Sequence, residues 1–328
     1  VENFQANGAA INQLCVQQDA DLRVYEMALD HPTQDFTQEP AMTQTECARA
    51  MAYGMMAVED GIDALCLGEM GIGNTTSAAA ICCGLFGGDA ANWVGSGTGV
   101  TGEALQRKAA AVQEAIALHG PAFEDPFEVA RCIGGHELSA IIGAVLAARI
   151  ARVPVLLDGY ACTAAAAVLH QIDPTALDHC VVGHLSAEPG HRRLVDALGQ
   201  IPVLDLGMRL GEGTGGGLPG QDCQVSVPGA DLVPTRRSLG RPLLNGGLGP
   251  APFYHTGRNR SQLTIAASIA MRIASDVCRA PSLSSMFTIC FFVTYFVPMS
   301  GGCVLPNAFE IRITFSWTSP CTKNFCVS

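Results

Sequence analysis

Short apolar runs alternate with longer segments of helical period over the first two thirds of the chain. Runs typical of buried strands occupy residues 22–25, 62–67, 153–157, 179–185 and 202–206. Segments with helical periodicity cover residues 6–20, 43–59, 102–119, 134–151 and 160–170. Two further helices are expected to begin at about residue 78 and after Pro189. This alternation predicts a three-layer α/β fold, with a mostly parallel Rossmann-like sheet covered by helices on both faces.

Local signals predict where several helices begin and end. Thr43 and Glu46 have the spacing of a capping box. Thr75 or Thr76 is expected to cap the helix that follows the strand at 62–67.

Polar side chains follow four of the predicted strands. Glu69, Asp158, Ser186 and Glu212 each stand where an apolar run ends. Ligands of open parallel sheets bind beyond the carboxyl ends of the strands. The sequence therefore predicts a binding site at this edge of the sheet.

A glycine-bearing loop at residues 68–76 joins a predicted strand to a predicted helix. Glycines let the backbone approach a phosphate, and the free N–H groups of the first helical turn point towards it. The expected phosphate cradle consists of Gly71, Gly73, Asn74 and Thr75. The alternative is an ordinary tight turn, which such a loop often is.

A second glycine-rich loop at residues 95–99 leads into a helix that carries Arg107 and Lys108. A long cationic side chain at Lys108 can swing back towards an anion. The alternative is that both residues are solvated surface charges, which is the commoner fate of such side chains.

Composition narrows the class of protein. The 328 residues are 48% hydrophobic, and their formal net charge of −11 argues against a nucleic-acid or anionic-membrane surface. The 14 cysteines form no CxxC pair and no cysteine–histidine zinc pattern, so we expect no metal site and a reducing, cytoplasmic environment.

The character of the sequence changes after residue 215. Residues 216–257 are rich in glycine and proline without a sustained period, and a short helix is expected at 262–275. The apolar run at 286–299 is shorter than the roughly 20 residues that span a bilayer. We expect residues 216–328 to be an atypical tail, out of frame or poorly ordered, although a fused segment is the alternative.

Five separated motifs carry a resemblance to a known family: residues 68–76, 97–99, 154–159, 184–191 and 209–215. Together they resemble nicotinate-nucleotide–dimethylbenzimidazole phosphoribosyltransferase over about residues 1–215. The resemblance implies transfer of the phosphoribosyl group from nicotinate mononucleotide to 5,6-dimethylbenzimidazole, giving α-ribazole 5′-phosphate and nicotinate for cobalamin biosynthesis. It implies no cofactor, a homodimer, and a small helical domain that is largely missing from this chain.

The same resemblance assigns roles to individual residues. Glu212 matches the catalytic base of the family. The substrate-binding residues would be Glu69, Gly71, Gly73, Asn74, Thr75, Lys108, Asp158, Ser186 and Leu210. For Ser186 and the carboxylates the alternative is that they order loops by bonding backbone N–H groups, and His184 and His191 are expected to cap or pack. The competing functions are an inactive, frame-disrupted product and a nucleotide-binding module that retains the phosphate loop.

Overall fold

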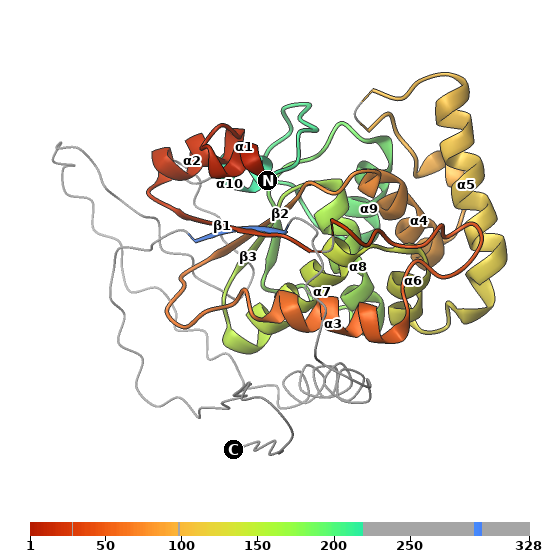
Figure 1. Ribbon diagram of the computed structural model, residues 1–328, viewed down its shortest axis with the longest axis horizontal. Helices are drawn as coiled ribbons and strands as arrows, with labels where there is room; N and C mark the ends of the chain where they lie inside the picture. The colour runs from red at the N-terminus through yellow and green to blue at the C-terminus, as the bar shows by residue number, and fades with distance from the viewer. Residues whose placement is uncertain (28, 98, 219–291, 297–328) are drawn as a thin grey trace, which may run out of the picture.

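The computed structural model describes residues 1–27, 29–97, 99–218 and 292–296. These residues form one five-stranded sheet with helices on both faces (Figure 1). The predicted α/β class is confirmed. The helix expected at 262–275 and nearly all of the predicted tail lie outside the described residues.

The strands lie in the order β1-β5-β2-β3-β4. Parallel pairing joins β2 to β3 and β3 to β4, whereas β5 runs antiparallel to both β1 and β2. The bounds are β1 Asp21–Tyr25, β2 Leu65–Glu69, β3 Val155–Leu157, β4 Cys180–Val182 and β5 Phe292–Phe296. Because β1 and β2 both oppose β5, they run in the same direction, and β5 is the one antiparallel strand in the described sheet.

The strand predicted at residues 202–206 is wrong as an extended element. Its one ladder contact is an isolated parallel bridge between His184 and Leu204. Pro202 lacks an N–H to donate, and Gly207 takes a left-handed φ of +66° that turns the chain away. The segment therefore follows the sheet edge only briefly.

Helices cover the two faces of the sheet unequally. One face packs against α7 (His136–Ala151) and α8 (Tyr160–Ile172), and the opposite face lies under α2 (Ala10–Gln18) and α10 (Thr214–Gly217). The remaining helices are α1 (Glu2–Gln5), α3 (Gln44–Met55), α4 (Asn74–Phe86), α5 (Glu103–His119), α6 (Pro126–Ile133) and α9 (Pro189–Leu198), with short 3-10 turns at Ala90–Asn92 and Gly120–Ala122.

Alternation along β2 serves both faces. Leu65 and Leu67 are fully buried in the larger core, whereas the side chain of Cys66 joins a smaller cluster with Ile11 and Cys15 of α2. Successive strand residues point to opposite sides of a sheet, so a strand covered on both faces reads as a continuous apolar run. This explains why residues 62–67 show no polar alternation.

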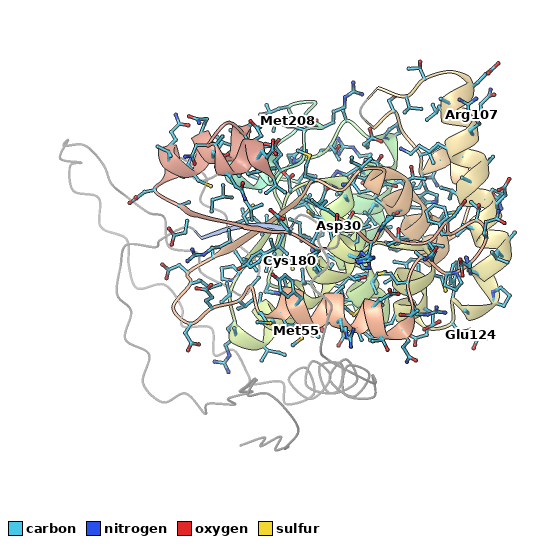
Figure 2. All side chains as sticks on the ribbon, in the orientation of Figure 1. Asp30, Met55, Arg107, Glu124, Cys180 and Met208 are labelled. Atoms are coloured by element: carbon cyan, nitrogen blue, oxygen red, sulfur yellow. The ribbon has the colours of Figure 1, made fainter. Side chains whose placement is uncertain are left out.

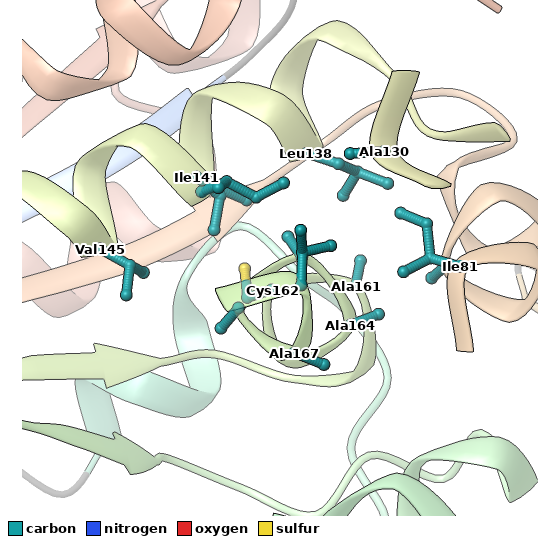
Figure 3. Close-up of a cluster of buried hydrophobic side chains, with 14 of the residues drawn as sticks. Ile81, Ala130, Leu138, Ile141, Val145, Ala161, Cys162, Ala164 and Ala167 are labelled. Carbon is teal, nitrogen blue, oxygen red and sulfur yellow. The ribbon is translucent and has the colours of Figure 1, made fainter. Parts of the chain in front are cut away.

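Small side chains let the helices of the larger core approach closely. Figure 3 shows α8 lined by Ala161, Ala164 and Ala167, with side chains of α4, α6 and α7 around it. A Cβ at Gly143 of α7 would overlap the backbone carbonyl of Met51 in α3, so only glycine permits this helix pair to pack as it does. The cysteines Cys66, Cys82, Cys83 and Cys162 are also buried, as expected of small hydrophobes.

The helix-boundary predictions have mixed outcomes. Thr43 caps α3 through the predicted capping box, with its Oγ1 accepting from the Glu46 N–H at 3.2 Å. The cap predicted for α4 is wrong, because its N-cap is Gly73 at φ +81° and no side chain bonds there. Helix α6 was not predicted, although Asp125 caps it and Pro126 opens it.

Within the part of the chain that is described, no helix is both long and apolar enough to cross a membrane.

Candidate active site

The two glutamates singled out at the sheet edge lie together. Glu69 ends β2, and the Glu212 N–H donates a hydrogen bond to the Glu69 carbonyl at 3.0 Å. A Cβ at Gly68 would overlap the backbone of Gly213, so the turn lies directly against the strand. The two residues are therefore neighbours through their backbones.

Glu212 has an unusual backbone conformation. Its φ of +64° is left-handed, which a residue with a Cβ rarely adopts and which costs on the order of 1–3 kcal/mol. Its side chain is buried, and Oε2 has no hydrogen-bond partner among the described residues. A buried carboxylate oxygen held open in this way is available to accept a proton or a hydrogen bond from a ligand.

Asp158 holds this turn in place. Its side chain is 1% exposed, and its carboxylate accepts from the N–H groups of Gly213 at 3.0 Å, Gly215 at 2.6 Å and Gly216 at 3.2 Å. Both carboxylate oxygens are therefore engaged by the segment that follows Glu212. The structure shows for Asp158 the loop-ordering role that the sequence left as an alternative.

Glu69 is in an environment that favours its neutral form. Burial raises the pKa of its carboxyl to about 8, with further contributions from the charges of Asp158 and Glu137 and an opposing hydrogen bond from Gly71. Ionising a carboxyl away from water and beside other carboxylates is unfavourable. Near neutral pH Glu69 thus retains its proton in the ligand-free protein.

The loop that follows β2 leads directly into α4. Gly73 is left-handed, and no atom lies within 4 Å of the place where its Cβ would be. Ile72 is fully exposed. The loop is therefore open at Gly73, where an anion could approach the start of the helix, whereas the Glu137 carboxylate packs against Gly71 and the Thr76 N–H already donates to the Gly73 carbonyl at 2.8 Å.

Lys108 reaches back to the first turn of α4. Its Nζ donates to Thr75 Oγ1 and to the Gly95 carbonyl, each at 2.9 Å. An ammonium group has three donors, so one remains, and Thr75 keeps its own hydroxyl proton to donate. Arg107, by contrast, projects from the outer side of α5 (Figure 2) and lies 3.8 Å from Glu103. Arg107 is therefore a solvated surface charge, whereas Lys108 is not.

Ser186 and His191 form a separate buried cluster. The Ser186 N–H donates to His191 Nδ1 at 2.9 Å, and Ser186 Oγ accepts from the Glu188 N–H at 3.3 Å. His191 Nε2 lies 3.1 Å from Thr163 Oγ1, whose proton goes to the Gly159 carbonyl. This network assigns the proton to Nε2, and burial lowers the pKa of His191 to about 3. His191 packs, as expected, and Ser186 orders the entry to α9.

A family model described as phosphoribosyltransferase matches residues 1–221. The chain belongs to this family. The match covers the sheet edge, the β2–α4 loop, Lys108 and the Glu212 turn, and it ends just beyond α10.

Relatives of this chain include proteins named nicotinate-nucleotide–dimethylbenzimidazole phosphoribosyltransferase. Those from Brucella canis and Brucella suis are 60% identical over 218 residues, which is 66% of this chain and 64% of each relative. The chain thus spans just under two thirds of their length.

Two solved structures are similar. One is CobT from Thermus thermophilus, with a TM-score of 0.60 and 43% identity over 66% of this chain and 71% of that one. The other, described as the dimethylbenzimidazole phosphoribosyltransferase of the same organism, has a TM-score of 0.59 and 41% identity over 66% and 70%.

The remaining predicted residue, Leu210, is 54% exposed on the loop before the Glu212 turn. The sequence reasoning missed two buried carboxylates near the site, Glu137 and Glu188. Glu137 acts on the pKa of Glu69, and Glu188 bonds the loop at residues 95–97. Glu188 lies inside the motif at 184–191, whereas Glu137 has no sequence signal beyond its place in the first turn of the helix that follows Gly134 and Gly135.

Proposed function

We propose that this chain transfers the phosphoribosyl group of nicotinate mononucleotide to 5,6-dimethylbenzimidazole, producing α-ribazole 5′-phosphate and nicotinate. The observation that carries the proposal is the buried, unbonded carboxylate oxygen of Glu212, on a turn whose backbone bonds Glu69 at the carboxyl end of β2, where the anion loop begins. The names of the relatives support the same reaction.

The reaction requires the protein to stabilise a cationic ribosyl centre, to anchor the phosphate and to remove the benzimidazole N–H proton. Departure of the nicotinate neutralises the pyridinium nitrogen, so the leaving group requires no acid. The ribosyl centre becomes cationic, the phosphate must be anchored, and the attacking benzimidazole must lose its N–H proton. Neither a metal nor an organic cofactor is required for these steps.

Glu212 is the base in this proposal. Its buried Oε2 accepts the proton of the benzimidazole N–H as the other nitrogen forms the new bond to the anomeric carbon. Glu69 keeps its own proton near pH 7, because burial raises the pKa of its carboxyl, so it acts as a hydrogen-bond donor at the same edge of the sheet. A positioned base of this kind contributes about 10²–10⁴-fold to the rate.

The β2–α4 loop and Lys108 anchor the phosphate. In this proposal the phosphate accepts from the Thr75 hydroxyl, from the third Lys108 donor and from first-turn N–H groups of α4 other than that of Thr76, which bonds Gly73. Gly73 and Asn74 supply the backbone of this cradle, and Gly71 shapes the loop while its N–H bonds the Glu69 carboxyl. Anchoring the phosphate orients the ribose, which determines the face that the benzimidazole attacks.

Ser186, Asp158 and Leu210 act around the substrates in this account. Asp158 holds the Glu212 turn, Ser186 orders the α9 entry, and the exposed Leu210 offers an apolar surface to the aromatic acceptor. The homodimer and the cytoplasmic location implied by the resemblance remain predictions.

The test is to incubate the purified chain with nicotinate mononucleotide and 5,6-dimethylbenzimidazole and to follow α-ribazole 5′-phosphate by chromatography and mass spectrometry. Formation of this product at a rate proportional to protein concentration is expected. A folded protein that binds the nucleotide without forming product would instead be a nucleotide-binding module.

A further inference from the structure

A buried carboxylate with no role in the proposed reaction lies behind the loop at residues 95–97. Glu188, at the N-cap of α9, is 4% exposed, and its Oε1 accepts from the Gly97 N–H at 2.8 Å. Its Oε2 is also buried and has no hydrogen-bond partner in the described part of the chain. Such a group costs free energy to bury, so its retention calls for a physical reason.

The loop is packed tightly onto this carboxylate. A Cβ at Gly95 would collide with Glu188 Oε2 and would lie 2.6 Å from Cδ of Pro189. The carbonyl of the same glycine accepts from Lys108 Nζ at 2.9 Å. Glu188 is therefore separated from the Lys108 ammonium by a single segment of backbone.

Glu188 also acts on Lys108 through its charge. Burial lowers the pKa of Lys108, and the Glu188 carboxylate raises it. The groups that bond the ammonium directly, Thr75 and the Gly95 carbonyl, are neutral. The negative charge that favours the protonated lysine thus comes from the α9 side of the loop.

Other charged groups near α5 are engaged elsewhere. Glu103 and Arg107 of the same helix face each other at the surface, 3.8 Å apart. Asp89 caps the 3-10 turn that packs on α5, and Glu128 pairs with Arg131 on α6 at 2.7 Å.

We propose that Glu188 is a positioning residue for the nucleotide phosphate, which fixes the loop at 95–97 and directs the Lys108 ammonium towards the start of α4 without touching the substrate. This inference rests on the proposed function, because it takes a phosphorylated nucleoside as the ligand. It predicts that the contribution of Glu188 is specific to the phosphate.

The test compares calorimetric binding of nicotinate mononucleotide with that of nicotinate riboside, which lacks the phosphate. Wild type, Glu188→Gln and the surface control Glu103→Gln are measured at pH 7.5 and 9.5. We expect Glu188→Gln to weaken mononucleotide binding at least tenfold at pH 7.5 and further at pH 9.5, because the lysine loses its proton more readily. Riboside binding should stay within twofold, and the control should match wild type.

A second variant separates charge from geometry. Glu188→Asp keeps the charge but withdraws the carboxylate from the Gly97 N–H, so the weakening should be similar at both pH values. If circular dichroism shows that Glu188→Gln does not fold, Glu188→Asp alone tests whether Glu188 contributes to phosphate binding.

Three results would overturn the inference: unchanged mononucleotide binding in both variants, equal weakening of riboside and mononucleotide, or a wild type that binds no mononucleotide. A wild type that binds the mononucleotide but forms no product would count against the proposed function alone. The comparison of variants would then still decide the role of Glu188.

Discussion

Replacing Glu69 by glutamine should change how the stability of the protein depends on pH. Glutamine keeps the volume of the side chain but cannot ionise. In the folded chain the pKa of Glu69 is raised from 4.5 to about 8, mainly by burial. The folded state therefore binds more protons than the unfolded state between these two values, and the free energy of unfolding falls as pH rises through this window.

The magnitude follows from the size of the shift. Each pKa unit corresponds to about 1.4 kcal/mol, so Glu69 lowers the stability of wild type by up to about 5 kcal/mol between pH 4.5 and 8. Glu69→Gln lacks this loss. We expect the free energy of unfolding of the variant to rise relative to that of wild type by about 1.4 kcal/mol per pH unit through the window.

The assay is urea unfolding, followed by circular dichroism at several pH values from 5 to 8.5. Groups that do not interact with Glu69 cancel in the difference, which leaves Glu69 and its coupled neighbours Asp158 and Glu137. The matched control is Glu103→Gln, which removes a carboxylate that is exposed to water on α5. A difference between Glu69→Gln and wild type that stays constant with pH would refute the reasoning.

Further substitutions test other parts of the account. Lys108→Ala should weaken nicotinate mononucleotide binding about 10- to 100-fold, since hydrogen bonds to charged groups contribute about 1.5–3 kcal/mol. Calorimetry measures this loss, and Arg107→Ala, the control, should bind the mononucleotide like wild type. Asp158→Asn places an amide against the N–H groups of Gly213, Gly215 and Gly216. The variant should show both a lower melting temperature and a turnover rate reduced at least tenfold. Normal turnover would show that Asp158 does not position the Glu212 turn for catalysis. Thr43→Ala should cost about 1 kcal/mol in urea unfolding by loss of the α3 cap and leave nucleotide binding unchanged.

Much of the fold could be predicted because its signals are local. The apolar runs that became β2, β3 and β4 are buried on both faces, and Thr43 with Glu46 is a complete capping signal within four residues. The predicted strand at 202–206 failed because the sheet edge accepts only a brief contact there. How far residues 202–206 pair with the sheet depends on the geometry of β4, which the apolar pattern of this segment does not encode.

The candidate site shows the same division. The sequence placed Glu69 and Glu212 at strand ends, and the fold brings them together. It could not show that the Asp158 carboxylate is fully engaged by the Glu212 turn, nor that Thr75 serves Lys108 instead of capping α4. These partners are separated by more than 30 residues along the chain, so only the packed structure reveals them.

The most direct test of the central claim is the single-turnover rate of Glu212→Gln with saturating nicotinate mononucleotide and dimethylbenzimidazole. Glutamine preserves the shape of the side chain but cannot accept the benzimidazole proton. The account predicts a rate at least 100-fold below wild type, with nucleotide affinity within about twofold. A rate close to that of wild type would contradict the assignment of Glu212 as the base.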